Sequence, residues 1–319
     1  MRSIKTKSLI LICLYLLFGT LSHVNADAPD LTIVSQNLKR FFDDKDDGNH
    51  EKVLKRNVYT KRLDLLVNKI STTYQFADVI AFQEIENIDI LNNVSELIYQ
   101  RFQHQYQAVL IEGNDQSGID VGYLVKQPIK ISNVYALFSE DLISKRRGYL
   151  FSRPPLVIEL CKKQCYTIVN LHLRSMRGLS SRKKNRYVAL KRKVQAEKMA
   201  KWINSFQHTN SWKNLVIIGD FNALSTSDKH VDTLGTIIGN PNQITPKYQS
   251  SDLIDLDLID MTKQVHQSRR YSYRYKRKKQ QLDYVLVNRQ LASQVKNIEF
   301  STIDYQFSDH AALIIQFKK

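Results

Sequence analysis

Cysteine and proline are scarce in this sequence, which has 3 and 6 of them among its 319 residues. It also lacks internal repeats and low-complexity linkers, so its composition marks no domain boundary. Hydrophobic residues make up 43% of the chain, which is enough for one large core and excludes a disordered protein. We therefore expect a single folded domain.

An apolar stretch from Leu9 to Leu21 lies near the N-terminus, between three basic residues and the small-residue pattern Val24-Asn25-Ala26. This arrangement is typical of a cleaved signal peptide. An uncleaved membrane anchor is the alternative, but the stretch is shorter than the roughly 20 residues that span a bilayer. We predict a signal peptide over residues 1–26, a mature domain over 27–319, and export to the periplasm or the medium.

Only Cys161 and Cys165 remain once the signal peptide, which contains Cys13, is removed. Their spacing across a tight turn permits a disulfide, and export would allow the bond to persist. No second cysteine or histidine pair lies nearby in the sequence, which disfavours a metal site there.

Acidic residues are too few to balance the basic ones. The chain has 47 Lys and Arg but only 31 Asp and Glu, so its net charge is +16. Residues 1–26 contain three basic and no acidic residues, so the mature chain would carry 44 against 31, or +13. A protein this basic attracts polyanions, with nucleic acid as the first expectation and an anionic membrane surface as the second. The sign of the charge alone does not choose between them.

Short runs rich in Val and Ile predict strands, and longer runs with an apolar residue at every third or fourth position predict helices. The strands are expected at 31–35, 78–83, 106–111, 119–125, 155–160, 166–171, 214–219, 282–287 and 311–317, and the helices at 52–70, 87–101 and 186–206. Strands with helices inserted at intervals indicate an α/β (α+β) chain of packed sheets covered by helices.

Polar residues follow six of the apolar runs, where the predicted strands end. Asp, Asn and Gly are ordinary turn formers after strands, which is the alternative interpretation for any single position. Loops at one sheet edge converge on a common place, however, so acidic, amide and imidazole groups at many strand ends predict a reaction site. These residues are Asn37, Glu84, Asp120, His172, Asp220 with Asn222, and Asp309 with His310.

Six short motifs between residues 31 and 317 form an ordered set: Asn37, Gln83-Glu84, Asn170-Leu171-His172, Gly219-Asp220-Phe221-Asn222, Leu282-Asp283-Tyr284 and Ser308-Asp309-His310. This set resembles the endonuclease/exonuclease/phosphatase superfamily, which has the deoxyribonuclease-like fold. Within it, the segments 37–43, 84–87 and 118–125 are most similar to bacterial extracellular nucleases. The resemblance implies two packed β-sheets flanked by helices, in a four-layer α/β/β/α sandwich.

The resemblance also implies a metal site suited to phosphate ester hydrolysis. Glu84 would bind the metal, expected to be Mg²⁺ with Mn²⁺ or Ca²⁺ as alternatives, because Mg²⁺ prefers one or two carboxylates plus waters and substrate phosphate. Asn37 and Asp309 would complete or orient its outer shell, although Asn37 could instead only stabilise a turn. Asp120 would contact substrate or metal, or else hydrogen-bond the amides of its loop.

The remaining motif residues would act on the water and the phosphate. By resemblance, Asp220 would position the attacking water and Asn222 would donate its amide to a phosphoryl oxygen. His310, held in one tautomer by Asp283, would stabilise charge on the phosphate or act as an acid, and His172 would be a second donor. The structural alternatives are a strand cap for Asp283 and a satisfied buried imidazole for His172.

Two basic segments adjoin the expected site. Nine basic residues lie from Arg174 to Lys193, directly after the His172 strand, where they would contact the phosphate backbone or form a solvated helix face. Seven more lie in 269–279 with three interleaved tyrosines, which could stack on bases or line one inward face of a strand. The residues expected to bind substrate are Arg174, Arg177, Lys183, Lys184, Arg186, Tyr273 and Arg274.

Three functions fit these features. The first is a secreted, divalent-metal-dependent endonuclease acting on DNA, with RNA as a further substrate, and by resemblance it would leave 5′-phosphate and 3′-hydroxyl ends. The second is a phosphodiesterase or phosphatase acting on phospholipid or inositol phosphate, although no apolar hairpin such as a Trp-Phe pair is present to insert into lipid. The third is a non-catalytic polyanion-binding secreted protein, which would not need the whole catalytic set. We expect a monomer with no obligate protein partner.

Overall fold

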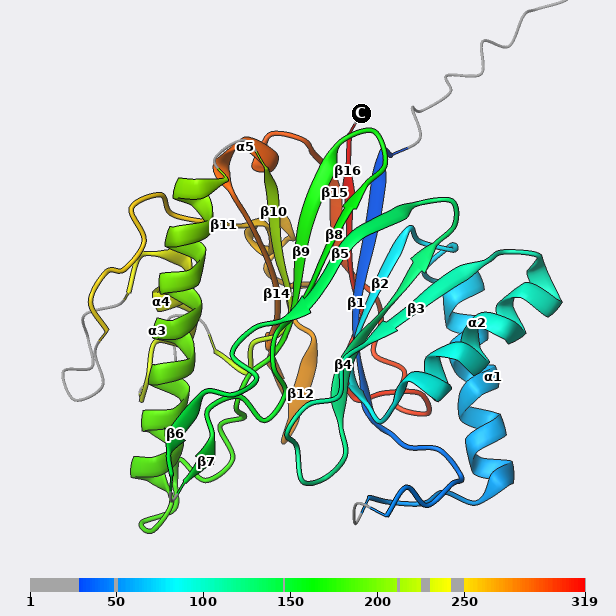
Figure 1. The fold of residues 1–319 in the computed structure, drawn as a ribbon, viewed down its shortest axis with the longest axis horizontal. Coiled ribbons are helices and arrows are strands. Elements are labelled where there is room, and N and C mark those ends of the chain that lie inside the picture. Colours follow the sequence, from blue (N-terminus) through cyan, green and yellow to red (C-terminus); the bar gives the residue numbers. More distant parts are fainter. Residues whose placement is uncertain are drawn as a thin grey trace, which may run out of the picture.

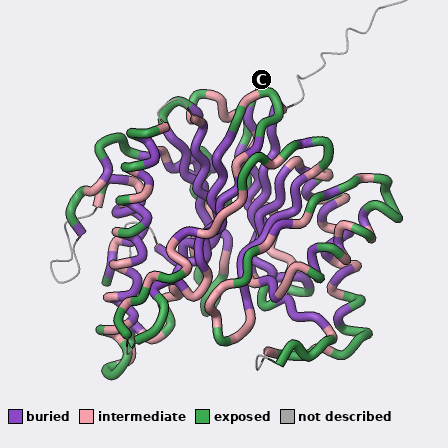
Figure 2. Tube along the Cα trace, in the orientation of Figure 1, coloured by how far each residue is buried: buried purple, intermediate pink, exposed green. Residues whose placement is uncertain are grey.

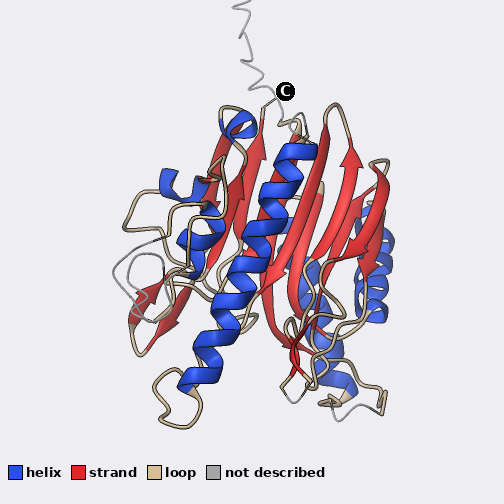
Figure 3. Ribbon diagram, turned by 60° about the vertical axis from the view of Figure 1, so that its left-hand side comes forward, coloured by secondary structure: helices blue, strands red, loops and turns tan. Residues whose placement is uncertain are grey.

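Two six-stranded β-sheets pack face to face in the computed structural model, and helices cover their outer faces (Figures 1 and 3). The structure describes residues 29–48, 51–145, 147–210, 213–224, 230–241 and 250–318, so the predicted signal peptide lies outside the described residues. The expected four-layer α/β/β/α sandwich is confirmed.

The first sheet has a parallel pair, β1 and β2, at its centre, and its other neighbouring pairs are antiparallel. Helix α1 (Arg56–Thr72) packs on its outer face through apolar residues three or four positions apart, from Tyr59 to Ile70. Helix α2 (Ile88–Phe102) lies beside it and begins at Asn87, whose side chain accepts the N–H of Ile90 at 3.1 Å. In spatial order the strands are β15 (Val295–Phe300), β16 (Leu313–Phe317), β1 (Leu31–Phe41), β2 (Val79–Ile85), β4 (Asp120–Lys126) and β3 (Tyr106–Leu110).

The second sheet repeats this arrangement, with the parallel pair β9 and β10 between antiparallel neighbours. Helices α3 (Asn185–Thr209) and α4 (Thr233–Ile238) contribute apolar side chains to the core on its outer face. In spatial order the strands are β11 (Ile259–Asp260), β14 (Asp283–Val287), β10 (Asn214–Asp220), β9 (Cys165–His172), β8 (Leu156–Cys161) and β5 (Lys130–Ala136). The smaller elements are hairpins β6 (Leu142–Ser144) with β7 (Gly148–Tyr149) and β12 (Tyr273–Tyr275) with β13 (Lys278–Gln280), the 3₁₀ helix Met261–Gln264 and helix α5 (Arg289–Ala292).

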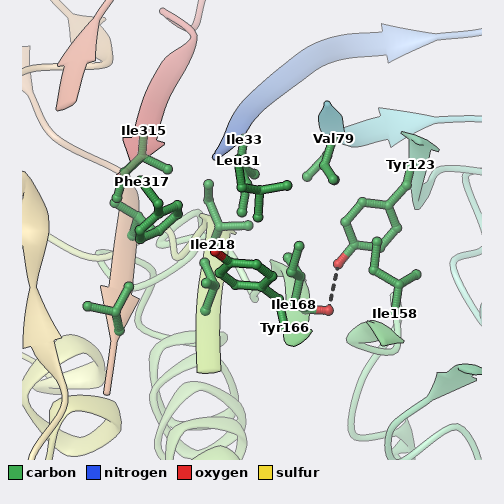
Figure 4. Close-up of a cluster of buried hydrophobic side chains, with 14 of the residues drawn as sticks. Leu31, Ile33, Val79, Tyr123, Ile158, Tyr166, Ile168, Ile218, Ile315 and Phe317 are labelled. Atoms are coloured by element: carbon green, nitrogen blue, oxygen red, sulfur yellow. Dashed lines mark hydrogen bonds between the residues drawn. The ribbon is translucent and has the colours of Figure 1, made fainter. Parts of the chain in front are cut away.

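A dry core joins the inner faces of the two sheets (Figure 4). Fully buried side chains such as Ile33, Val79 and Ile218 meet there, and each contributes about 1.5–3 kcal/mol by leaving water. The phenol of Tyr123 crosses between the sheets and donates to the Ile168 carbonyl oxygen at 3.0 Å. Figure 2 shows the strands buried along most of their length and the helices exposed on their outer sides. The sheets therefore form a rigid frame for the loops at their ends.

All nine predicted strands are present, and the three predicted helices differ from α1, α2 and α3 by a few residues at their ends. The strands β5 and β15 were not predicted, because most residues of these edge strands are exposed or half-buried and they have no apolar run. Cys161 and Cys165 form the expected disulfide across the β8–β9 turn. Among the described residues, no helix has the length and apolar character required for a membrane span.

Candidate active site

The carboxyl ends of four parallel strands meet at one edge of the sandwich, the lower edge in Figure 1. His172, Asp220 and Asp283 lie next to one another in register across β9, β10 and β14. Asn37 and Glu84 occupy the corresponding ends of β1 and β2 in the other sheet. The two central parallel pairs thus bring motifs that are far apart in sequence to one place.

Backbone geometry explains why a glycine precedes Asp220 and shows that two residues at the strand ends adopt an uncommon conformation. Gly219 has φ of 135°, and a Cβ at this position would meet the Leu171 carbonyl oxygen at 2.1 Å, so only glycine lets β10 lie this close to β9. Glu84 and Asn222 are left-handed, with φ of 60° and 50°. Non-glycine residues rarely adopt this conformation, and it persists only where neighbouring contacts hold it.

Asn37 joins the two sheets at the site. Its Nδ2 donates to Glu84 Oε1 at 3.2 Å and to Asp220 Oδ2 at 3.1 Å. Its Oδ1 accepts the backbone N–H of Lys39 at 2.9 Å, which fixes the orientation of the amide. Asn37 therefore links Glu84 of the first sheet to Asp220 of the second.

Asp220 and His172 form the buried part of the site. Burial raises the pKa of Asp220 to about 7, with a further contribution from the Asp283 carboxylate. His172 Nε2 lies 3.7 Å from both Asp220 Oδ2 and Glu84 Oε1, and its Nδ1 has no hydrogen-bond partner among the described residues. Burial, together with the positive charge of Arg153, holds the pKa of His172 well below its usual range. His172 is therefore a neutral imidazole facing two carboxylates.

His310 has the opposite environment. Its Nδ1 lies 2.7 Å from Asp283 Oδ2, and the backbone N–H of Asp283 is held by Ser272 Oγ at 3.1 Å. Burial lowers the pKa of His310, but the Asp283, Asp220 and Asp309 carboxylates more than offset this effect and raise it to about 10. His310 is therefore an imidazolium at neutral pH. The ring of Tyr273, a predicted substrate contact, lies 5.0 Å from the His310 ring.

The acidic residues here fit a hard divalent cation. The Glu84 side chain is 21% exposed and so remains accessible, and Asp309 is half-buried beside His310. Within the described residues, no group of three or more His, Cys, Asp or Glu side chains forms a ready metal cage. A cation would also offset the mutual repulsion between Glu84 and Asp220.

Asn222 is held by a residue that sequence reasoning missed. Its backbone N–H donates to Asp220 Oδ1 at 2.8 Å, and its side-chain amide donates to the Leu173 carbonyl oxygen at 3.1 Å. Arg192, only 1% exposed, donates to the carbonyl oxygens of Asn222 at 2.8 Å and Arg174 at 2.7 Å. Arg192 carries no distinct signal in the sequence, because it lies within a basic run that is also typical of a solvated helix face.

The predicted substrate residues lie at several places. Arg174, Arg177 and Lys184 line a cavity of about 470 Å³ together with Gly178 and Ser181, hereafter the Arg174 cavity. Lys183 and Arg186 are exposed at the adjoining start of α3, and Arg274 is exposed beside Tyr273. Arg174 lies two residues beyond His172, and Arg274 is next to Tyr273, whose ring lies beside His310.

Asp120 does not join this cluster. It is 4% exposed, and its carboxyl hydrogen-bonds to Glu112 and to the Gly113 N–H. Burial, and then the Glu112 charge, raise the pKa of Asp120 to about 8. These contacts fit the alternative interpretation, a residue that supports its own loop, and substrate contact by Asp120 stays a prediction.

Two packed sheets with acid, amide and imidazole groups at one edge define a phosphate ester hydrolase of the deoxyribonuclease-like class. The chain belongs to the endonuclease/exonuclease/phosphatase family, whose sequence model matches residues 32–313. Family membership makes it a hydrolase acting on phosphodiester bonds.

Solved structures of several proteins have the same fold. An endonuclease/exonuclease/phosphatase from Bacteroides vulgatus is 12% identical with a TM-score of 0.59, over 90% of this chain and 98% of that one. An AP endonuclease from Archaeoglobus fulgidus is 14% identical with a TM-score of 0.58, over 91% and 100% of the two chains. TDP2 from D. rerio, complexed with single strand DNA product, is 14% identical with a TM-score of 0.54, over 91% and 99%. No curated protein matches in sequence.

Proposed function

We propose that this protein is a secreted, divalent-metal-dependent endonuclease that hydrolyses DNA, with RNA as a further substrate. The observation that carries the proposal is the meeting of two units at one sheet edge. One is the His310–Asp283 pair at 2.7 Å, and the other is Asn37 bridging Asp220 at 3.1 Å and Glu84 at 3.2 Å. A non-catalytic polyanion-binding protein would not need both units.

Each residue of the candidate site has its own role in the proposed reaction. Asp220 orients the attacking water and accepts its proton, which its raised pKa of about 7 makes favourable near neutral pH. His310, protonated and held by Asp283, donates to a phosphoryl oxygen and stabilises the developing charge. Neutral His172 and the Asn222 amide add donors to the same phosphate. Glu84 would hold Mg²⁺, which supplies charge relief at the phosphate when bound, and Asp309 would orient its water shell.

The charge around the site supports a nucleic acid as the substrate. The Arg174 cavity begins two residues beyond His172 and continues to the exposed start of α3, and its cations can bind phosphates on either side of the cleaved bond. Two proteins of the same fold act on nucleic acid by their own descriptions, an AP endonuclease and a TDP2 bound to a DNA product. All residues of the candidate site belong to one chain, so the proposed reaction is compatible with the predicted monomer that has no obligate protein partner.

A substrate panel tests the proposal. Supercoiled plasmid, single-stranded RNA, and vesicles containing sphingomyelin or a phosphoinositide are each incubated with the protein and Mg²⁺, and products are measured by gel or phosphate release. We expect nicking of the plasmid and no release from the vesicles. Release from lipid without cleavage of either nucleic acid would replace this proposal with the phospholipid or inositol phosphate function.

Export is tested separately. We propose cleavage after Ala26, so the protein recovered from the periplasm or medium should begin at Asp27. N-terminal sequencing of the recovered protein measures this directly. Retention of residues 1–26 in the membrane fraction would favour the anchor alternative.

A further inference from the structure

A second basic surface begins beside the candidate active site and follows helix α1. It is a groove of about 560 Å³, hereafter the α1 groove. No Asp or Glu side chain is among the residues that line it. Its lining includes Lys39, Arg40, Lys52, Lys61, Arg62 and Tyr305.

Arg62 builds the groove through backbone contacts. Its guanidinium donates to the carbonyl oxygens of Leu38 at 2.5 Å, Lys39 at 3.3 Å and Arg40 at 2.8 Å, and it lies 4.3 Å from the Phe41 ring centroid. Lys39 and Arg40 are both left-handed, with φ of 53° and 55°. Two consecutive residues in this conformation need support from their surroundings, and Arg62 provides it. The result is an exposed pair of cations two and three residues beyond Asn37.

The side chains of Lys39, Arg40, Lys52 and Lys61 are exposed, and within the described residues none of them forms an ion pair with a carboxylate. The ion pairs on this face use other residues, Arg56 with Asp44 and Lys69 with Asp304. Four unneutralised cations in one groove repel one another, and an anionic ligand would relieve that repulsion.

The shape of the groove favours an extended polyanion over a compact headgroup. Its wall on α1 runs from Val58 to Leu65, a span of about 10 Å along the helix. Phosphates of one strand in a duplex recur about every 3.4 Å along the axis, so this wall is long enough for roughly three nucleotides. Tyr305, 56% exposed at the groove, offers a ring for base or sugar contact.

The inner end of the groove is tied to the catalytic residues. Phe307 lines the groove next to Ser308, whose Oγ donates to the Asn37 carbonyl oxygen at 2.7 Å. Lys39 both lines the groove and donates its N–H to Asn37 Oδ1 at 2.9 Å. A chain lying in the groove would therefore lead directly to the residues that hold Glu84 and Asp220.

We propose that the α1 groove binds the phosphate backbone of the nucleic acid substrate on the side of the active site opposite the Arg174 cavity. Helices α1 and α3 cover the outer faces of different sheets, so the two basic surfaces flank the strand-end site (Figure 1). The inference rests on the proposed nuclease function. A substrate held on both sides of the cleaved bond is what internal cleavage of a strand requires.

The test uses the double variant Lys52→Gln with Lys61→Gln. Its matched control is Lys130→Gln with Lys201→Gln, two exposed lysines at the start of β5 and on α3. Binding of a fluorescently labelled duplex is measured by anisotropy at several salt concentrations with chelator present. Hydrolysis of bis(p-nitrophenyl) phosphate, which is too small to reach the groove, is measured with Mg²⁺.

The groove variant is expected to bind the duplex at least about tenfold more weakly at low salt, with a salt slope smaller by about 0.9 for each lost phosphate contact. Its hydrolysis of the small diester should match wild type, and the control should match wild type in both assays. An equal loss of binding in the control would overturn the proposal, as would weakened binding to phosphatidylserine vesicles with unchanged DNA binding. A groove-dependent DNA affinity in a wild type that hydrolyses no diester would support the groove and refute the nuclease function.

Discussion

The two buried histidines at the sheet edge stand in opposite electrostatic environments. His310 has Asp283 at 2.7 Å, and carboxylates raise its pKa to about 10. His172 has no partner on Nδ1 among the described residues, and burial holds its pKa well below the usual range. Both interact with Asp220, one as a cation and one as a neutral ring.

Because of this difference, we expect the two histidines to have different roles in catalysis. A charged, oriented imidazolium can stabilise a phosphoryl oxygen that gains charge in the transition state. A neutral imidazole 3.7 Å from two carboxylates can donate only a single N–H and adds no charge. Four measurements test the difference between His310 and His172 and contrast both with the basic residues around the site.

Removing the partner of His310 should have the largest effect. Asp283→Asn keeps the size of the side chain but removes its charge and allows the wrong imidazole tautomer, so we expect kcat to fall by about 10³–10⁴-fold. Steady-state cleavage of a labelled duplex measures the change, with duplex affinity in chelator as the control. A fall of less than about tenfold would show that His310 acts without Asp283.

The same substitution should alter stability in a pH-dependent way. The folded pKa of His310, about 10, is above its ordinary value of about 6.5, so the stabilisation by the charged ring is complete below pH 6.5 and is lost as the pH rises through 10. In metal-free protein, Asp283→Asn should lower the free energy of unfolding by about 3 kcal/mol at pH 6 and by clearly less above pH 10. Urea unfolding at the two pH values measures this, and equal losses would contradict the charged pair.

His172 should matter less. His172→Gln retains a donor of similar reach, so we expect kcat to fall by about 10²-fold or less, the usual cost of one imperfect donor to a developing oxyanion. The pKa of His172 is well below its ordinary value of about 6.5 in the folded protein, so the unfolded ring takes up a proton near pH 6 that the folded ring does not. Wild type should therefore lose stability relative to the variant as the pH falls from 8 to 6. A wild type that instead gains stability relative to the variant as the pH falls would mean that His172 is charged in the folded protein.

The basic rim should affect binding and leave turnover unchanged. Replacing Lys183, Lys184 and Arg186 with Gln removes exposed charges at the start of α3, so KM for duplex DNA should rise several-fold and its salt dependence should flatten. At saturating substrate kcat should equal that of wild type, in contrast to the histidine variants. An unchanged KM and salt slope would identify this run as a solvated surface only.

Sequence reasoning located the parts of the site that short motifs carry. Glu84 and Asp220 lie at the carboxyl ends of apolar strands, and His310 precedes β16, which runs antiparallel to β1, so strand pairing brings all three to one edge. The resemblance identified Asp283 as the partner of His310, and the structure places its carboxylate against the ring. Local pattern and strand order were sufficient for these residues.

Tertiary contacts, which the sequence pattern does not show, determine the roles of other residues near the site. Arg62 and Arg192 lie on amphipathic helices, where the sequence pattern predicts that cations face solvent. Their guanidinium groups instead donate to the backbone carbonyl oxygens of Lys39 and Asn222. Asp120 resembles the other strand-end acids in sequence, but its side chain turns toward the Gly113 loop. The direction of a side chain at a strand end depends on a loop that folds from elsewhere, so periodicity gives no information about it.

Nicking of supercoiled plasmid by wild-type protein and by His310→Ala, each with Mg²⁺ and with chelator, tests the central claim most directly. We expect metal-dependent nicking by wild type and a rate lower by several orders of magnitude in the folded variant. Equal nicking by the two proteins, or nicking that persists in chelator, would contradict the assignment of metal-dependent nuclease activity to this site.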